Sequence, residues 1–203
     1  GEPQMLRQLA NPEAARLVRR VLAAGIRAEG PIHRERLARL TASAFGVPRV
    51  NAARMASILA LLPEPGAEFL WPATSDRTPL DPAGWTTFRR HAASTDRALE
   101  HVPPEEIGNA MVALCRSVAG MTRDDLFQQT LAVFGHRRRH PVLMPPLELA
   151  LAQAVRAGRI TRQSAGQWLT AVADGDADLH AVPTPPVPPS TVVREHLDQP
   201  AAG

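Results

Sequence analysis

The sequence predicts a mainly α-helical protein built from two copies of one supersecondary unit, and three observations support this. The stretches EGPIHRERLARLTASAFG (29–46) and AGMTRDDLFQQTLAVFG (119–135) share a glycine break, an amphipathic run and a final Phe-Gly. Apolar residues of the two halves pair at a constant offset of 89, from Val18 with Ile107 to Met55 with Met144. Within each copy, apolar residues recur at helical spacing between Pro, Gly and capping residues. We therefore expect a duplicated three-helix unit.

The first copy predicts three helices followed by a strand. Asn11-Pro12-Glu13 is a helix start, with an N-cap before a proline at the first helical position. Gly30-Pro31 ends this helix, and a second helix ends at Gly46. A third helix is expected from about Asn51 to Leu62. The segment GAEFLWP (66–72) is typical of a short strand ended by proline, at the wing position of a winged helix.

The second copy predicts a similar order with a different ending. Its first helix follows Pro103-Pro104, and Thr122 caps the next helix with Asp125 three residues later. A third helix is expected from about Leu147 to Ala157, and Gly158-Arg159-Ile160 predicts a strand. The segment TRQSAGQWLTAVADG (161–175) predicts a further helix around Trp168 rather than a hairpin.

The predicted fold class is therefore mainly α, with two tandem winged-helix-like (helix-turn-helix) units and short wing strands. The expected boundaries are 1–72 for the first unit, 73–104 for a connector packed through Trp85 and Phe88, and 105–180 for the second unit with its extra helix. Residues 181–203 form a Pro-rich tail, expected to be extended or disordered.

Composition excludes several function classes. All 23 basic residues among the 203 are arginine, and the absence of lysine excludes a Walker A loop, a Schiff-base lysine and a lysine-bearing nuclease core. The single cysteine forms no internal disulfide, which suits a reducing cytoplasm. No apolar run reaches the roughly 20 residues of a membrane span, and no signal peptide is expected. The net charge of +3 is segregated, with +6 over residues 1–60 and +5 over residues 136–162.

One stretch also resembles a known family. Glu29-Gly30-Pro31-Ile32-His33, Ala44-Phe45-Gly46 and Trp71-Pro72 resemble the C-terminal domain of unknown function found in very large bacterial superfamily-one helicase-like proteins. In those proteins a helicase core, and often a Vsr-like nuclease domain, precedes this domain. The resemblance is good over residues 13–72 and looser over 105–160. Since the helicase and nuclease motifs are absent here, it implies an accessory piece or a fragment, with a helicase or nuclease as parent or partner.

The leading functional hypothesis is DNA binding, to double or single strands. In a helix-turn-helix unit, the last helix lies in the major groove and its polar residues reach bases and phosphates. The residues expected there are Arg49, Arg54 and Ser57 in the first copy and Arg137, Arg138 and Arg139 in the second. The alternatives are an ordinary solvated face, or a protein-interaction module in which the tandem units clasp a partner.

Catalysis and metal binding have weaker support. His136 and His140 are four residues apart, but three arginines separate them and Pro141 follows. His33 is expected to cap or pack a loop, and Cys115 to be a core thiol. Trp71 and Trp168 are expected in packing rather than base stacking. We therefore expect no catalytic residue, no cofactor and no metal.

Overall fold

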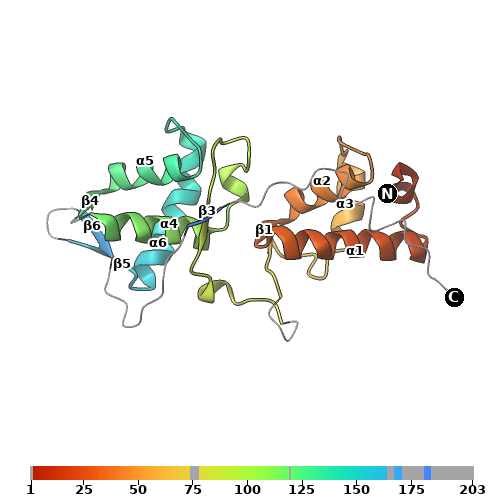
Figure 1. The fold of residues 1–203 in the computed structure, drawn as a ribbon, viewed down its shortest axis with the longest axis horizontal. Coiled ribbons are helices and arrows are strands. Elements are labelled where there is room, and N and C mark those ends of the chain that lie inside the picture. The colour runs from red at the N-terminus through yellow and green to blue at the C-terminus, as the bar shows by residue number, and fades with distance from the viewer. Residues whose placement is uncertain (1, 74–77, 119, 164–166, 171–180, 184–203) are drawn as a thin grey trace. The chain divides into compact units, whose positions relative to one another are not determined.

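A computed structural model describes residues 2–73, 78–118, 120–163, 167–170 and 181–183 (Figure 1). These residues are mainly helical, with six α-helices and small sheets. The chain divides into two compact units, Gly1–Pro79 (unit 1) and Leu80–Thr184 (unit 2). The division falls inside the segment expected to be a connector, and residues 80–104 belong to unit 2.

Unit 1 contains three α-helices and one pair of strands. Its elements in chain order are η1 (Pro3–Arg7), α1 (Pro12–Glu29), β1 (Ile32–His33), α2 (Arg34–Ala44), α3 (Ala52–Leu59) and β2 (Phe69–Leu70). β1 and β2 are antiparallel, with Ile32 opposite Leu70. The helices bury one apolar face each around a core that includes Leu6, Val18, Leu22, Ile32, Leu37, Phe45, Ile58, Leu62 and Leu70.

Side-chain caps fix where the helices of unit 1 begin. The Asn11 side chain accepts a hydrogen bond from the Glu13 N–H, and Asn51 accepts one from the Arg54 N–H. His33 Nδ1 accepts from the Glu35 N–H at 3.3 Å. Each cap satisfies an N–H group that has no partner within its helix. The expected capping role of His33 is confirmed.

The described part of unit 2 contains three α-helices, and most of the segment that was expected to be a connector precedes them. Its elements are η2 (Pro82–Gly84), β3 (Phe88–Arg90), η3 (Leu99–His101), α4 (Pro104–Ser117), β4 (Met121–Thr122), α5 (Arg123–Val133), η4 (Pro141–Leu143), α6 (Met144–Arg156), β5 (Ile160–Arg162), β6 (Gln167–Thr170) and β7 (Ala181–Pro183). β4, β6 and β5 form an antiparallel sheet in that order, and β3 pairs in parallel with β7. The core includes Phe88, Ile107, Met111, Leu126, Phe134, Leu147 and Ile160.

The two units keep the offset of 89 in their central parts. β4 and α5 begin and end 89 residues after β1 and α2. Thr41 and Thr130 are both buried at equivalent positions of α2 and α5. Each helix is followed by a glycine with positive φ, Gly46 at 72° and Gly135 at 76°. This left-handed conformation favours glycine, so the repeated Phe-Gly ends both helices by the same mechanism.

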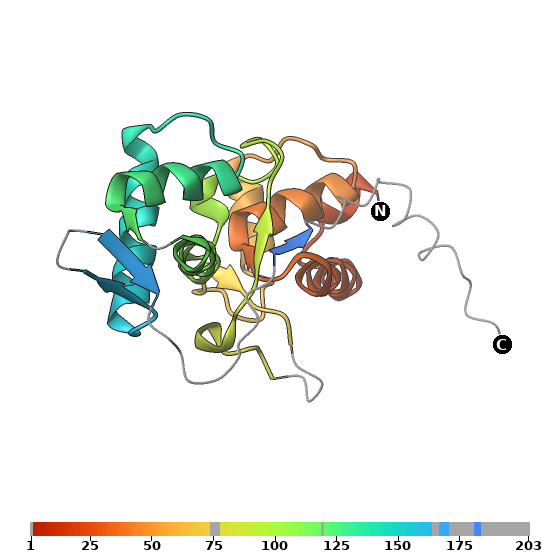
Figure 2. The same cartoon turned by 60° about the vertical axis from the view of Figure 1, so that its left-hand side comes forward.

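The helix expected around Trp168 is wrong. Residues 167–170 form β6, which makes a hairpin with β5 beside α6 (Figure 2). Trp168 lies opposite Met121 of β4 and packs on the core, so strand pairing outweighs the helical pattern. The remainder of that predicted helix, residues 171–175, lies outside the described residues.

Two further boundaries differ from expectation. α6 begins at Met144, three residues before the predicted start at Leu147, because Pro145 and Pro146 occupy its first turn, where proline is tolerated. Residues 181–183 of the expected tail form β7. Thr122 accepts from the Asp125 N–H at 3.1 Å, as the predicted capping box requires.

Candidate nucleic-acid interface

The motif that carries the family resemblance builds the fold of unit 1. Glu29 forms an ion pair with Arg36 at the start of α2. A Cβ on Gly30 would lie 2.5 Å from the Ile26 carbonyl oxygen and 3.0 Å from Pro72 Cδ. Pro72 therefore packs where only glycine fits. The motif therefore contains both the Gly-Pro break and the Trp-Pro segment because the two pack against each other.

The predicted site residues of unit 1 lie on or just before α3. Arg49 is exposed in the turn that precedes α3, and Arg54 lies half-buried in its first turn. Neither arginine forms an ion pair with any other described residue. Ser57 is exposed, and its hydroxyl donates to the Ala53 carbonyl at 3.0 Å. The exposed face also presents Ala53 and Ala56, so it is cationic with small side chains.

The predicted site residues of unit 2 lie in the turn between α5 and η4. Arg137, Arg138 and Arg139 are all exposed, and Arg138 is the equivalent of Arg49 at the offset of 89. Arg139 donates to Asp124 at 2.9 Å, and this hydrogen bond lowers the pKa of the Asp124 carboxyl. Arg137 and Arg138 have no such partner within the described part of the chain. Of the five predicted arginines, Arg54 alone lies within a third helix.

The exposed face of α6 differs from that of α3. Leu149 and Val155 of α6 are 50% and 38% exposed, and Val142 of η4, just before the helix, is 64% exposed. Glu148 lies among them and forms an ion pair with Arg123 at 2.7 Å. The third helix of unit 2 therefore presents an apolar surface where that of unit 1 is small and cationic.

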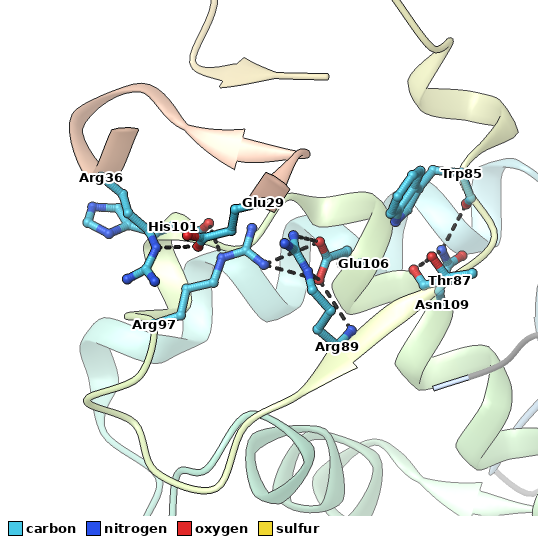
Figure 3. A network of polar contacts seen from close by, with 9 residues as sticks. All are labelled: Glu29, Arg36, Trp85, Thr87, Arg89, Arg97, His101, Glu106 and Asn109. Atoms are coloured by element: carbon cyan, nitrogen blue, oxygen red, sulfur yellow. Dashed lines mark hydrogen bonds and ion pairs between the residues drawn. The ribbon is translucent and has the colours of Figure 1, made fainter. Parts of the chain in front are cut away.

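A buried network of charges in unit 2 was not predicted (Figure 3). Glu106 of α4 is fully buried and forms ion pairs with Arg89 of β3 and Arg97. Arg97 also donates from Nε to the His101 carbonyl at 2.8 Å. The two cations come from the segment before α4, so the network attaches this segment to the helix. The sequence signal was a carboxylate beside Ile107, on the buried side of a helix.

Asn109 extends this polar contact along α4 (Figure 3). Its side-chain amide donates to the carbonyl oxygens of Trp85 and Thr87 at 2.8 and 2.9 Å. Its Oδ1 accepts from Arg159 at 2.5 Å. Burial lowers the pKa of Arg159. All these groups are hydrogen-bonded to one another, as buried polar groups require, and they explain how the chain before α4 is held.

The side chains considered for metal binding and nucleophilic chemistry differ in burial. No three His, Cys, Asp or Glu side chains of the described ranges are grouped as a metal ion needs. His136 is half-buried and burial lowers its pKa, whereas His140 is exposed. Burial raises the pKa of the Cys115 thiol to about 11, which disfavours the reactive thiolate. In the same ranges, no helix has the length and apolar character to cross a membrane.

Comparison with known proteins gives one partial match. A family described as "Protein of unknown function (DUF3320)" matches residues 7–55, from the end of η1 into α3. The match includes the Glu29–His33 motif and the Ala44–Gly46 helix end, and stops before Trp71. No curated protein and no solved structure matches the chain. Most of unit 1 is therefore similar to a domain of unknown function.

Proposed function

We propose that the protein is a non-catalytic DNA-binding accessory module of a helicase- or nuclease-type protein, and that both units are winged-helix-like. The fold part of this proposal is supported by unit 2. Its order is α4, β4, α5, α6, β5 and β6, and β6 lies between β4 and β5. In unit 1, β1 pairs with β2 as β4 pairs with β6. The proposed link to a helicase or nuclease rests on the family resemblance.

The observation that carries the DNA proposal is the exposed face of α3. Residues 45–59 contain two arginines and no carboxylate. The positive charge of this face is therefore not cancelled by acidic residues of the same segment, and it attracts phosphate. Ala53, Ala56 and Ser57 are small, and small side chains permit a helix to approach the floor of the roughly 12 Å wide major groove. The free N–H groups of the first turn also favour anions at this end of the helix.

Unit 2 contributes a second set of phosphate contacts in this proposal. Arg137 and Arg138 are exposed at the same place in the repeat as Arg49. Arg139 contributes less, since its guanidinium is already hydrogen-bonded to Asp124. Affinity comes mainly from phosphates, and base readout is weak, because the α3 face offers few side chains that reach base edges.

The test is fluorescence anisotropy of a labelled duplex and a labelled single strand across a salt series. The variant R49A/R54A removes two unpaired cations, and R137A/R138A removes the second pair. The control R39A/R123A also removes two exposed arginines, but these are ion-paired with Glu35 and Glu148. We expect each test variant to weaken binding and to reduce the slope of log affinity against log salt by about two.

Two results would contradict this proposal. One is an absence of wild-type binding to either probe even at low salt. The other is an equal loss of affinity in the control and the test variants, which would show that net charge alone determines binding. Circular dichroism of each variant checks that the helices are retained.

A further inference from the structure

The face of α6 that points to solvent carries a row of apolar side chains. The row begins at Val142 of η4 and continues along α6 through Pro145, Leu149 and Ala152, all exposed and at intervals of three, four and three residues. Val155 lies beside its end. This is the spacing of a seam along which a second helix packs. At 1.5 Å per residue, the 13 residues of α6 give a surface of about 20 Å, enough for roughly three to four turns of a partner.

Unit 1 shows that the fold itself does not require this row. At the offset of 89, Val142 and Leu149 correspond to Ala53 and Ala60, which are also exposed. Ile58 and Leu62, which face the core of unit 1, correspond to Leu147 and Leu151, which face the core of unit 2. The buried side of the third helix is thus kept between the copies, while its solvent side has large apolar residues in unit 2 alone.

The charges around the row indicate what covers it. Arg138 is exposed before the row and Arg156 is exposed at its other end. The acidic Glu148 is already paired with Arg123. If a second copy packed its own α6 here, arginines would oppose arginines in either orientation, which is unfavourable. A helix with acidic residues at its ends satisfies both arginines.

We propose that the exposed face of α6 is a docking site for an amphipathic helix of a partner protein that carries acidic residues beside its apolar stripe. Leu149 and Val142 supply the apolar contact, and Arg138 and Arg156 select the charge. This site goes beyond the DNA-binding function. It shares Arg138 with the proposed phosphate contacts, but its apolar row contributes nothing to phosphate binding. The mode is that of a helix placed along an apolar helical surface.

The probe is a fluorescein-labelled peptide of 18 residues, with leucine at the a and d positions of a heptad and glutamate at the e and g positions. Control peptides are a scrambled sequence of the same composition and a version with lysine in place of glutamate. The variant V142S/L149S removes the apolar contact. The control V118S changes another exposed valine, 42% exposed against 64% for Val142, at the end of α4.

We expect the acidic peptide to bind the wild-type chain and the V118S variant alike, and V142S/L149S to weaken binding at least about tenfold. R138A/R156A should weaken the acidic peptide and improve the lysine peptide. The affinity of V142S/L149S for duplex DNA should equal that of wild type, so the two proposals fail separately. Equal binding of the scrambled peptide, or no loss in V142S/L149S, would overturn the inference. So would sedimentation showing that wild type dimerises and V142S/L149S does not.

Discussion

Neutralising Glu106 tests whether the buried charges of unit 2 hold the segment before α4. Glu106 is fully buried, and the side chains of Arg89 and Arg97 are 6% and 2% exposed. The change Glu106→Gln keeps the shape of the side chain and removes its negative charge. Two guanidinium groups then share a buried site with a neutral amide in place of the carboxylate that forms an ion pair with each of them.

The expected loss of stability follows from this burial. Removing one partner of a buried ion pair typically costs about 3–5 kcal/mol, because the remaining charge is left without compensation. For a domain of roughly 100 residues, each kcal/mol lowers Tm by about 4–8 °C. We therefore expect the unfolding transition of unit 2 to fall by more than about 10 °C in differential scanning calorimetry.

The matched control is Glu148→Gln in the same unit. Glu148 and Arg123 form an ion pair of the same chemical type, but their side chains are 55% and 48% exposed. An exposed pair contributes about 0–1 kcal/mol, so this variant should melt within a few degrees of wild type. Equal transitions for Glu106→Gln and wild type would refute the reasoning, because they would mean that the network is not a stabilising contact.

Three further predictions use pairs of positions or pH. Thr41 has a buried hydroxyl without a partner among the described residues, whereas the Thr130 hydroxyl donates to a backbone carbonyl at 2.7 Å. In urea titrations, Thr41→Val should therefore leave the free energy of unfolding unchanged or raise it, and Thr130→Val should lower it by about 1 kcal/mol. The opposite order of the two variants would contradict this. Gly135→Ala should lower the free energy of unfolding clearly more than Gly158→Ala. Both glycines have positive φ, but of the two only Gly135 would place a Cβ 2.5 Å from a backbone atom. Similar losses of stability would show that backbone strain alone determines the effect. Burial, and next the Arg97 guanidinium, lowers the pKa of His91 from 6.5 to about 4. The unfolded chain therefore binds the proton first, and about 3 kcal/mol of stability is present above pH 6.5 and lost as pH falls towards 4. His91→Leu should flatten that slope, and an unchanged slope would argue against His91.

Local signals in the sequence were enough to predict most helices. Asn11 and Thr122 mark helix starts because a side-chain cap acts within three residues, and Gly46 marks an end because its conformation depends on its own φ. The start of α6 was misplaced because Pro145 and Pro146 suggested a break, although the first turn of a helix tolerates them. These features depend on neighbours along the chain.

Features that depend on distant residues were missed. β6 is a strand because β4 and β5 pair with it, and nothing within residues 167–170 alone selects a strand over a helix. The position of Glu106 beside Ile107 indicated burial, but its pairing with Arg89, 17 residues earlier in the chain, could not be inferred from spacing. At the candidate interface, the exposure of Arg49 and Arg138 could be inferred from the repeat, but the pairing of Arg139 with Asp124 could not.

The network around Glu106 also bears on which substitutions this chain can accept. The residue of unit 1 at the equivalent position is Leu17, which needs no cation. A buried carboxylate at position 106 requires the cations that form ion pairs with it, Arg89 and Arg97. Substitutions at these three positions are therefore constrained to occur together. In homologous chains, we expect positions 89, 97 and 106 to covary, with a carboxylate at 106 accompanied by arginines at 89 and 97.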